Sequence, residues 1–214
     1  MRRPALLLSL LLSACSTYTA DYQARLVESM PDKNRVTFDR METFRGRVLC
    51  GEYTAYRRDG YGQKTSAFVV TPELTLTDPG DDKRAVFCSD DPEASLFSTF
   101  GISAAEADRP ALGKISGDMA LIETAVLAFY NDRGYAPQTL EQLLEGDFGA
   151  TAADLEDPWA RPYRFSAGLA GRSLPRFTLS TLGRDGARGG TGPDADIDNH
   201  MIDVVRHVLA ISEP

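Results

Sequence analysis

Residues 111–132, ALGKISGDMALIETAVLAFYND, decide the fold of the second half of this 214-residue chain. Their apolar side chains recur at spacings of three and four residues, which places them on one face of a helix. Gly134 follows and favours the end of a helix. The stretch therefore predicts one long amphipathic helix, with an apolar stripe formed by Ile115, Met119, Ile122, Val126, Phe129 and Tyr130.

The segments after this helix alternate between apolar and polar residues, as short strands do. Tyr163 and Phe165 begin one such segment, residues 176–180 form another, and residues 168–174 would link them as a hairpin. Trp159, the only tryptophan, precedes them, and we expect it to cover the apolar face of the helix. The second half is thus predicted as a long helix packed on a small antiparallel sheet.

The segments before the helix predict a separate, β-rich module. Short β-prone runs are separated by turn signals, and they lie near residues 36–38, 47–50, 65–70 and 84–88. Ser103 and Glu106 form a capping box, which predicts a short helix stopped near Pro110. The fold class is therefore α+β, with a β module over 35–100, a helix-containing domain over 101–214, and a boundary near 100–110.

The first residues have the layout of a secretory signal. Arg2 and Arg3 precede an apolar run, which is too short to span a hydrocarbon core of about 30 Å. The run ends in Leu12-Ser13-Ala14-Cys15, which resembles the lipobox of bacterial lipoproteins and implies cleavage before Cys15 and acylation of its thiol. Residues 1–14 are expected to be a signal peptide and 15–34 a lipid anchor and tether. An ordinary signal with an incidental cysteine is the alternative.

The remaining cysteines fit an oxidising compartment. With Cys15 lipidated, Cys50 and Cys88 remain, and we expect them to lie on different strands and to form a disulfide. In the chain-entropy model, closing that loop contributes about 3–4 kcal/mol. Two free buried thiols are the alternative.

The charge of the chain excludes two classes of ligand. The formal net charge is −8, so nucleic acid and anionic lipid head groups should be repelled. Membrane contact is then expected through the lipid on Cys15 alone. Ser16 after the lipidated position favours, by resemblance to enterobacterial lipoproteins, the outer membrane facing the periplasm.

Four motifs of the second half, taken in order, resemble the globular part of the type II secretion major pseudopilin, protein G. The family pattern has a helix ending in an aromatic, a "D-N-G-x-Y-P"-like turn, a second small helix, "D-P-W-G-N-P-Y", and "S-L-G-x-D-G…G-G…D-A-D-I". The matching segments here are 118–137, 139–143, 157–163 and 180–197. The resemblance spans residues 111–199 and implies a pseudopilin-like head.

One departure limits what the resemblance implies. A pseudopilin begins with a prepilin-peptidase site and a long hydrophobic helix that packs in the filament core. Here a lipoprotein-like signal and a disulfide module stand in that place, so the chain is not expected to join a filament by helix bundling.

The last motif is an acidic, glycine-rich loop over residues 182–199. Clustered carboxylates and inward-turned carbonyls are hard oxygen ligands of the kind that suit Ca²⁺. From glycine and aspartate content alone, a solvated acidic turn is the more common structure. The pseudopilin resemblance implies calcium, with Leu182 supplying a carbonyl and Asp185, Asp194 and Asp196 supplying carboxylates.

These features predict a non-enzymatic envelope lipoprotein whose calcium-stabilised, pseudopilin-like domain serves protein–protein interaction, with no small-molecule substrate. An accessory role in a type II secretion or type IV pilus apparatus is the alternative within this class. A small hydrolase using Asp and Glu residues is the alternative from another class, although no convergent acid–base constellation can be recognised. Glu123 and Asp157 are interpreted as surface or capping groups.

Overall fold

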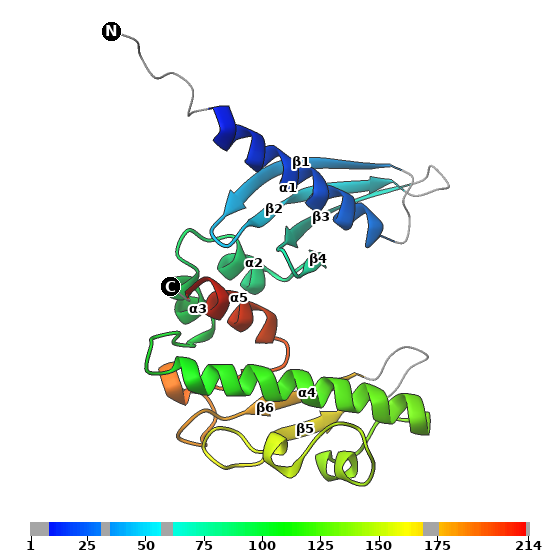
Figure 1. Cartoon of the computed structure of the whole chain (residues 1–214), viewed down its shortest axis with the longest axis vertical. Helices are drawn as coiled ribbons and strands as arrows, with labels where there is room; N and C mark the ends of the chain where they lie inside the picture. Colours follow the sequence, from blue (N-terminus) through cyan, green and yellow to red (C-terminus); the bar gives the residue numbers. More distant parts are fainter. Residues whose placement is uncertain (1–8, 31–34, 57–61, 169–175, 213–214) are drawn as a thin grey trace. The chain divides into compact units, whose positions relative to one another are not determined.

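A computed structural model describes residues 9–30, 35–56, 62–168 and 176–212 (Figure 1). The chain divides into two compact units, Met1–Pro92 and Glu93–Pro214. The predicted hairpin link at 169–174 and the first residues of the predicted signal lie outside the described residues. The structure is α+β, as predicted, with two antiparallel sheets and one long helix.

The first unit is a four-stranded antiparallel sheet with helices. The sheet order is β1-β2-β3-β4, and a helix, α1, runs across the sheet (Figure 1). The elements are α1 (Ser9–Glu28), β1 (Val36–Phe44), β2 (Val48–Tyr56), β3 (Gln63–Val70), β4 (Thr75–Thr77) and α2 (Asp81–Phe87). The strands expected near residues 36, 47 and 65 are therefore present.

Helix α1 supplies part of the core of this unit. Tyr22, Leu26 and Met30 recur every four residues, are buried, and pack with Leu49 and Phe68 of the sheet. Arg25 fixes the helix further, because its Nη1 donates to the carbonyl of Thr71 at 2.9 Å. Residues 18–28 of the expected tether thus belong to a helix that packs on the sheet.

Cys50 and Cys88 form the predicted disulfide, with Cα atoms 6.0 Å apart. Cys50 lies on β2, but Cys88 follows helix α2, so the prediction of a strand over 84–88 was wrong. Asp81 and Asp82 occupy the first turn of α2, where carboxylates are favoured by the helix dipole. The bridge therefore joins a strand to a helix end.

The second unit contains the long helix and a three-stranded antiparallel sheet, ordered β5-β6-β7. Helix α4 lies across β5 and β6 (Figure 1). The elements are α3 (Pro92–Phe100), α4 (Arg109–Arg133), η1 (Leu140–Leu144), η2 (Ala152–Leu155), β5 (Arg164–Ala167), β6 (Phe177–Thr181), η3 (Gly192–Asp194), β7 (Ile197–Asp198) and α5 (Ile202–Ser212).

Helix α4 confirms the predicted periodicity. Its buried face includes Ile115, Met119, Ile122, Val126 and Phe129, all at most 3% exposed, whereas Tyr130, also predicted in the stripe, is half-buried. The helix ends at the left-handed residue Gly134, whose N–H bonds to the carbonyl of Tyr130 at 2.8 Å.

The start of α4 differs from the prediction. Residues 103–106 are not helical, and Pro110 lies in the first turn of α4 instead of stopping an earlier helix. Proline fits there because the first turn needs no N–H donor. Arg109 anchors this end, since its Nε donates to the carbonyl of Ala104 at 3.0 Å and its Nη1 to that of Ser212 at 3.1 Å.

Helix α5 is also tied to α4 by the side chain of Arg206. Arg206 donates from Nε to the hydroxyl of Ser116 and from Nη2 to its carbonyl, both at 2.7 Å. Among the helices of the described ranges, none combines the length and the apolar character needed to cross a bilayer.

Candidate functional site: a glycine-rich loop and its buried support

The segment between η2 and β5 is organised by a buried carboxylate. Asp157 is 4% exposed, and its Oδ1 accepts hydrogen bonds from the backbone N–H of Trp159 at 2.9 Å and of Arg161 at 3.0 Å. Its Oδ2 accepts from the hydroxyl of Thr181 on β6 at 2.7 Å. Asp157 was interpreted as a surface or capping group. It is not on the surface, because this buried side chain accepts the backbone N–H groups of a turn and joins that turn to the sheet.

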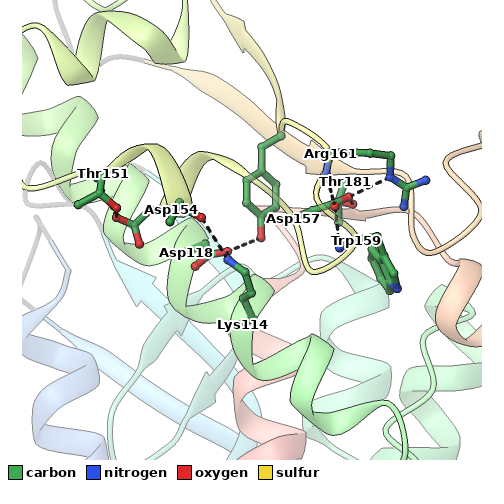
Figure 2. Close-up of polar contacts among 10 residues, drawn as sticks. Lys114, Asp118, Thr151, Asp154, Asp157, Trp159, Arg161 and Thr181 are labelled. Carbon is green, nitrogen blue, oxygen red and sulfur yellow. Dashed lines mark hydrogen bonds and ion pairs between the residues drawn. The ribbon is translucent and has the colours of Figure 1, made fainter.

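Arg161 projects from that turn toward the loop after β6 (Figure 2). Its Nε lies 3.6 Å from Oδ2 of Asp157, and its Nη2 donates to the carbonyl of Gly183. The guanidinium carbon lies 5.6 Å from the centre of the Trp159 ring, within cation–π range. The guanidinium is therefore held by a carboxylate, a carbonyl and an aromatic face.

Trp159 lies beside the first turns of α4. It lines a hollow of about 150 Å³ together with Ala111 and Leu112 of that helix and Pro193 of the loop. The tryptophan thus sits where helix and loop approach each other.

A second polar cluster joins α4 to the start of β5 (Figure 2). The hydroxyl of Tyr163 donates to Oδ2 of Asp118 at 2.8 Å, and Nζ of Lys114 lies 2.6 Å from the same oxygen. Burial, followed by the hydrogen bond to Asp118, raises the pKa of Tyr163 well above its usual range. Tyr163 is therefore a neutral donor and a poor nucleophile.

The loop over residues 182–199 is held largely by its own backbone. Arg184 N–H donates to the carbonyl of Pro193 at 2.8 Å, and Gly192 N–H donates to that of Gly101 at 2.6 Å. Gly183 has φ of 65°, and a Cβ there would lie 2.5 Å from the carbonyl carbon of Asp194. The two limbs of the loop approach so closely that only glycine fits at this point.

The predicted calcium ligands are placed in different local contacts. Asp185 accepts from the N–H of Ala187 at 2.9 Å, and Oδ1 of Asp194 lies 3.1 Å from Nε of Arg184. Within the described part of the chain, no group of three or more His, Cys, Asp or Glu side chains is arranged to hold a metal ion. The carboxylates of this loop are thus not gathered into a cage.

Asp196 has a different environment. Its Oδ2 accepts from the N–H of Gly189 at 3.0 Å, whereas its Oδ1 is buried without a hydrogen-bond partner. Leu182 and Asp196 line a common hollow of about 330 Å³, to which Arg164 and Arg188 also contribute. A buried carboxylate oxygen without a hydrogen-bond partner is costly unless a cation lies close to it.

Residues 105–200 match the family model described as Type II secretion system (T2SS), protein G. We refer to this matched segment as the protein G domain. The match begins just before α4 and ends after β7, so it contains the helix, the sheet and the glycine-rich loop. It confirms the resemblance predicted from the four motifs. No curated protein matches the chain.

The sequence predicted the loop of the protein G domain but missed part of its support. Arg161 and Thr181 were not predicted to contact the loop or the turn beside it. The Asp-Pro-Trp order was an available signal, because an aspartate before such a turn often accepts from the N–H two residues on. The contact between Arg161 and Gly183 is not local, and no signal in the sequence marks it.

Glu123, interpreted as a surface or capping group, accepts from Nδ2 of Asn199 at 3.1 Å. Oδ1 of Asn199 accepts from the N–H of Leu179 at 3.1 Å. The asparagine therefore connects α4 to β6.

Proposed function

We propose that this protein is a non-enzymatic envelope lipoprotein whose protein G domain binds a protein of the secretion apparatus. The match of residues 105–200 to the protein G family carries the proposal. The chemistry of the buried polar groups supports it, because Asp157 and Tyr163 are both engaged in holding turns and elements together. An accessory role beside the pseudopilins is the specific form that we favour.

Exposed apolar residues on α4 and in the segment after it offer sites at which to test this interaction. Leu127, Tyr135 and Leu144 are large apolar residues that are 38%, 52% and 42% exposed. A photo-crosslinking amino acid at each position, in cells that carry a type II secretion system, should yield adducts with its components. The exposed polar position Thr124 on the same helix is the control. Adducts that contain no secretion component would contradict the proposal.

The same domain is proposed to bind Ca²⁺ at the glycine-rich loop. Support comes from the acidic, glycine-rich motif, from the oxygen atoms that line the hollow beside Leu182, and from Oδ1 of Asp196, which has no hydrogen-bond partner. Asp185 and Asp194 would join after leaving the contacts described above. The ion would neutralise carboxylates and stabilise the folded state by mass action, at the millimolar concentrations typical of extracellular sites.

Thermal unfolding in calcium and in chelator tests the ion. We expect the midpoint to rise by several degrees at about ten to a hundred times the dissociation constant, since such saturation contributes roughly 1.4–2.7 kcal/mol. Asp196→Ala should abolish the rise, whereas Asp147→Ala at an exposed site outside the loop should retain it. An unchanged midpoint for the unmodified protein would remove calcium from the proposal.

A further inference from the structure

Arg161 occupies the base of the glycine-rich loop, where its guanidinium contacts the loop backbone. Its Nη2 donates to the carbonyl of Gly183, the first glycine of the loop, and its Nε lies 3.6 Å from Asp157. Asp157 in turn bonds to Thr181, two residues before Gly183. The guanidinium therefore joins the turn after η2 to the point at which the chain leaves β6.

The loop backbone is shaped around this side chain. Gly186 has φ of 68°, and a Cβ at that position would collide with Nη1 of Arg161. A side chain at Gly186 would have to displace the guanidinium, and the left-handed backbone conformation also disfavours one there. Two glycines of the loop, Gly183 and Gly186, thus lie directly against Arg161.

A second guanidinium acts on the rim of the loop. Nε of Arg184 lies 3.1 Å from Oδ1 of Asp194, while the N–H of Arg184 bonds to the carbonyl of Pro193. The negative charge of Asp194, one of the predicted calcium ligands, is thereby offset by a side chain of the same protein. The buried oxygen of Asp196 is left without such a partner.

From this arrangement we propose that Arg161, a half-buried cation of the chain itself, holds the base of the loop in its native conformation when no metal is bound. It is a positioning residue, and Ca²⁺ then acts on the part of the loop around Asp196. This inference deepens the calcium proposal for the same loop, because it divides the loop into a part held by Arg161 and a part left to the ion. The loop base should accordingly stay ordered in chelator.

Hydrogen exchange of the full-length protein in chelator tests the proposal. In Arg161→Gln, we expect the amides of residues 183–194 to exchange at least about tenfold faster than in the unmodified protein. Emission from Trp159 should also change, because the cation beside its ring is lost. Arg176→Gln, at an exposed position on the same domain, is the matched control and should change neither readout.

Arg161→Lys keeps the positive charge but loses the planar guanidinium that can donate two parallel hydrogen bonds, so we expect an intermediate exchange rate. This variant also provides a test if Arg161→Gln does not fold. Unchanged loop exchange in a folded Arg161→Gln or Arg161→Lys protein would overturn the proposal. The chelator measurement does not depend on calcium binding. A chain that ignores calcium but loses loop protection in Arg161→Gln would remove the ion and keep the role of Arg161.

Discussion

Tyr163 illustrates how a single polar side chain stabilises the protein G domain. It is 4% exposed, and its hydroxyl reaches Asp118 across the space between β5 and α4. Because burial and the acceptor both favour the neutral phenol, the folded state holds the proton more tightly than the unfolded chain does. The contact therefore contributes stability that depends on pH.

Replacing Tyr163 by Phe should lower the free energy of unfolding by about 1–2 kcal/mol at neutral pH, because the half-buried Asp118 loses a donor. The pKa is raised in the folded state, so the stabilisation is complete below about pH 10, the unfolded value, and is lost as the pH rises above it. Urea unfolding between neutral and alkaline pH should show the two proteins converging. Tyr135→Phe, at a 52% exposed site, is the control, and parallel curves for Tyr163→Phe and the unmodified protein would contradict the argument.

Single residues also show where sequence reasoning reaches its limit. Asp157 was visible as part of a motif, but its burial depends on Thr181, which comes from a strand 24 residues later. Arg161 is similar, since its partner Gly183 lies 22 residues away. Local patterns identify turns, whereas contacts between distant segments need the fold.

Among the elements, the long helix was predictable and its neighbours were less so. The stripe of α4 repeats over 25 residues, so its period is unambiguous. Residues 84–88 are too few to separate period two from period 3.6, and the acidic first turn of α2 was the better signal. Pro110 was interpreted as a stop, although proline is equally at home in the first turn of a helix.

Two glycines in the loop after β6 give a prediction, because they differ in the space around the Cα atom. Both Gly183 and Gly189 have positive φ, at 65° and 88°, but only at Gly183 would a Cβ collide with the chain, whereas Gly189 has open space around it. Gly183→Ala should therefore cost several kcal/mol, and Gly189→Ala only about 1–2 kcal/mol of backbone strain. Urea unfolding of both variants measures the difference. Equal losses would mean that the close approach of the two limbs is absent in solution.

The bridge between β2 and the end of α2 gives a prediction for the first unit. Replacing both Cys50 and Cys88 by Ser should lower its stability by about 3–4 kcal/mol, because the unfolded chain regains the freedom of a 38-residue separation. Hydrogen exchange in β2 and β3 reports this unit separately. Reductant should reproduce the effect in the unmodified protein and add nothing to the double variant, and an unaffected β2 would contradict the estimate.

For the whole molecule, the proposed attachment to a membrane would depend on Cys15, whose side chain lies outside the described residues. Cys15→Ser should move the protein from the membrane fraction to the soluble fraction, since acyl chains are the predicted contact. Ser16→Ala leaves the thiol in place and should keep the protein in the membrane fraction. Cell fractionation measures both, and a Cys15→Ser protein that stays with the membrane would exclude the anchor.

The organisation of the whole molecule was predicted in outline. A β-rich first part, a disulfide and a helix-on-sheet second part are all present, because each left a local pattern or a cysteine count in the sequence. The two compact units divide at Pro92, whereas the sequence predicted the domain boundary at 100–110. Helix α3 lies between these two points.

The anchorage of Arg109 at the first turn of α4 limits how the domain can be extended. The guanidinium holds the carbonyls of Ala104 and Ser212, and its Nη2 lies 3.7 Å from Glu93, so three segments converge on this helix end. A straight rod continuing upstream from α4 would have to displace all three. A filament that binds this domain must therefore contact its sides, because segments of the same chain block the N-terminal end of α4.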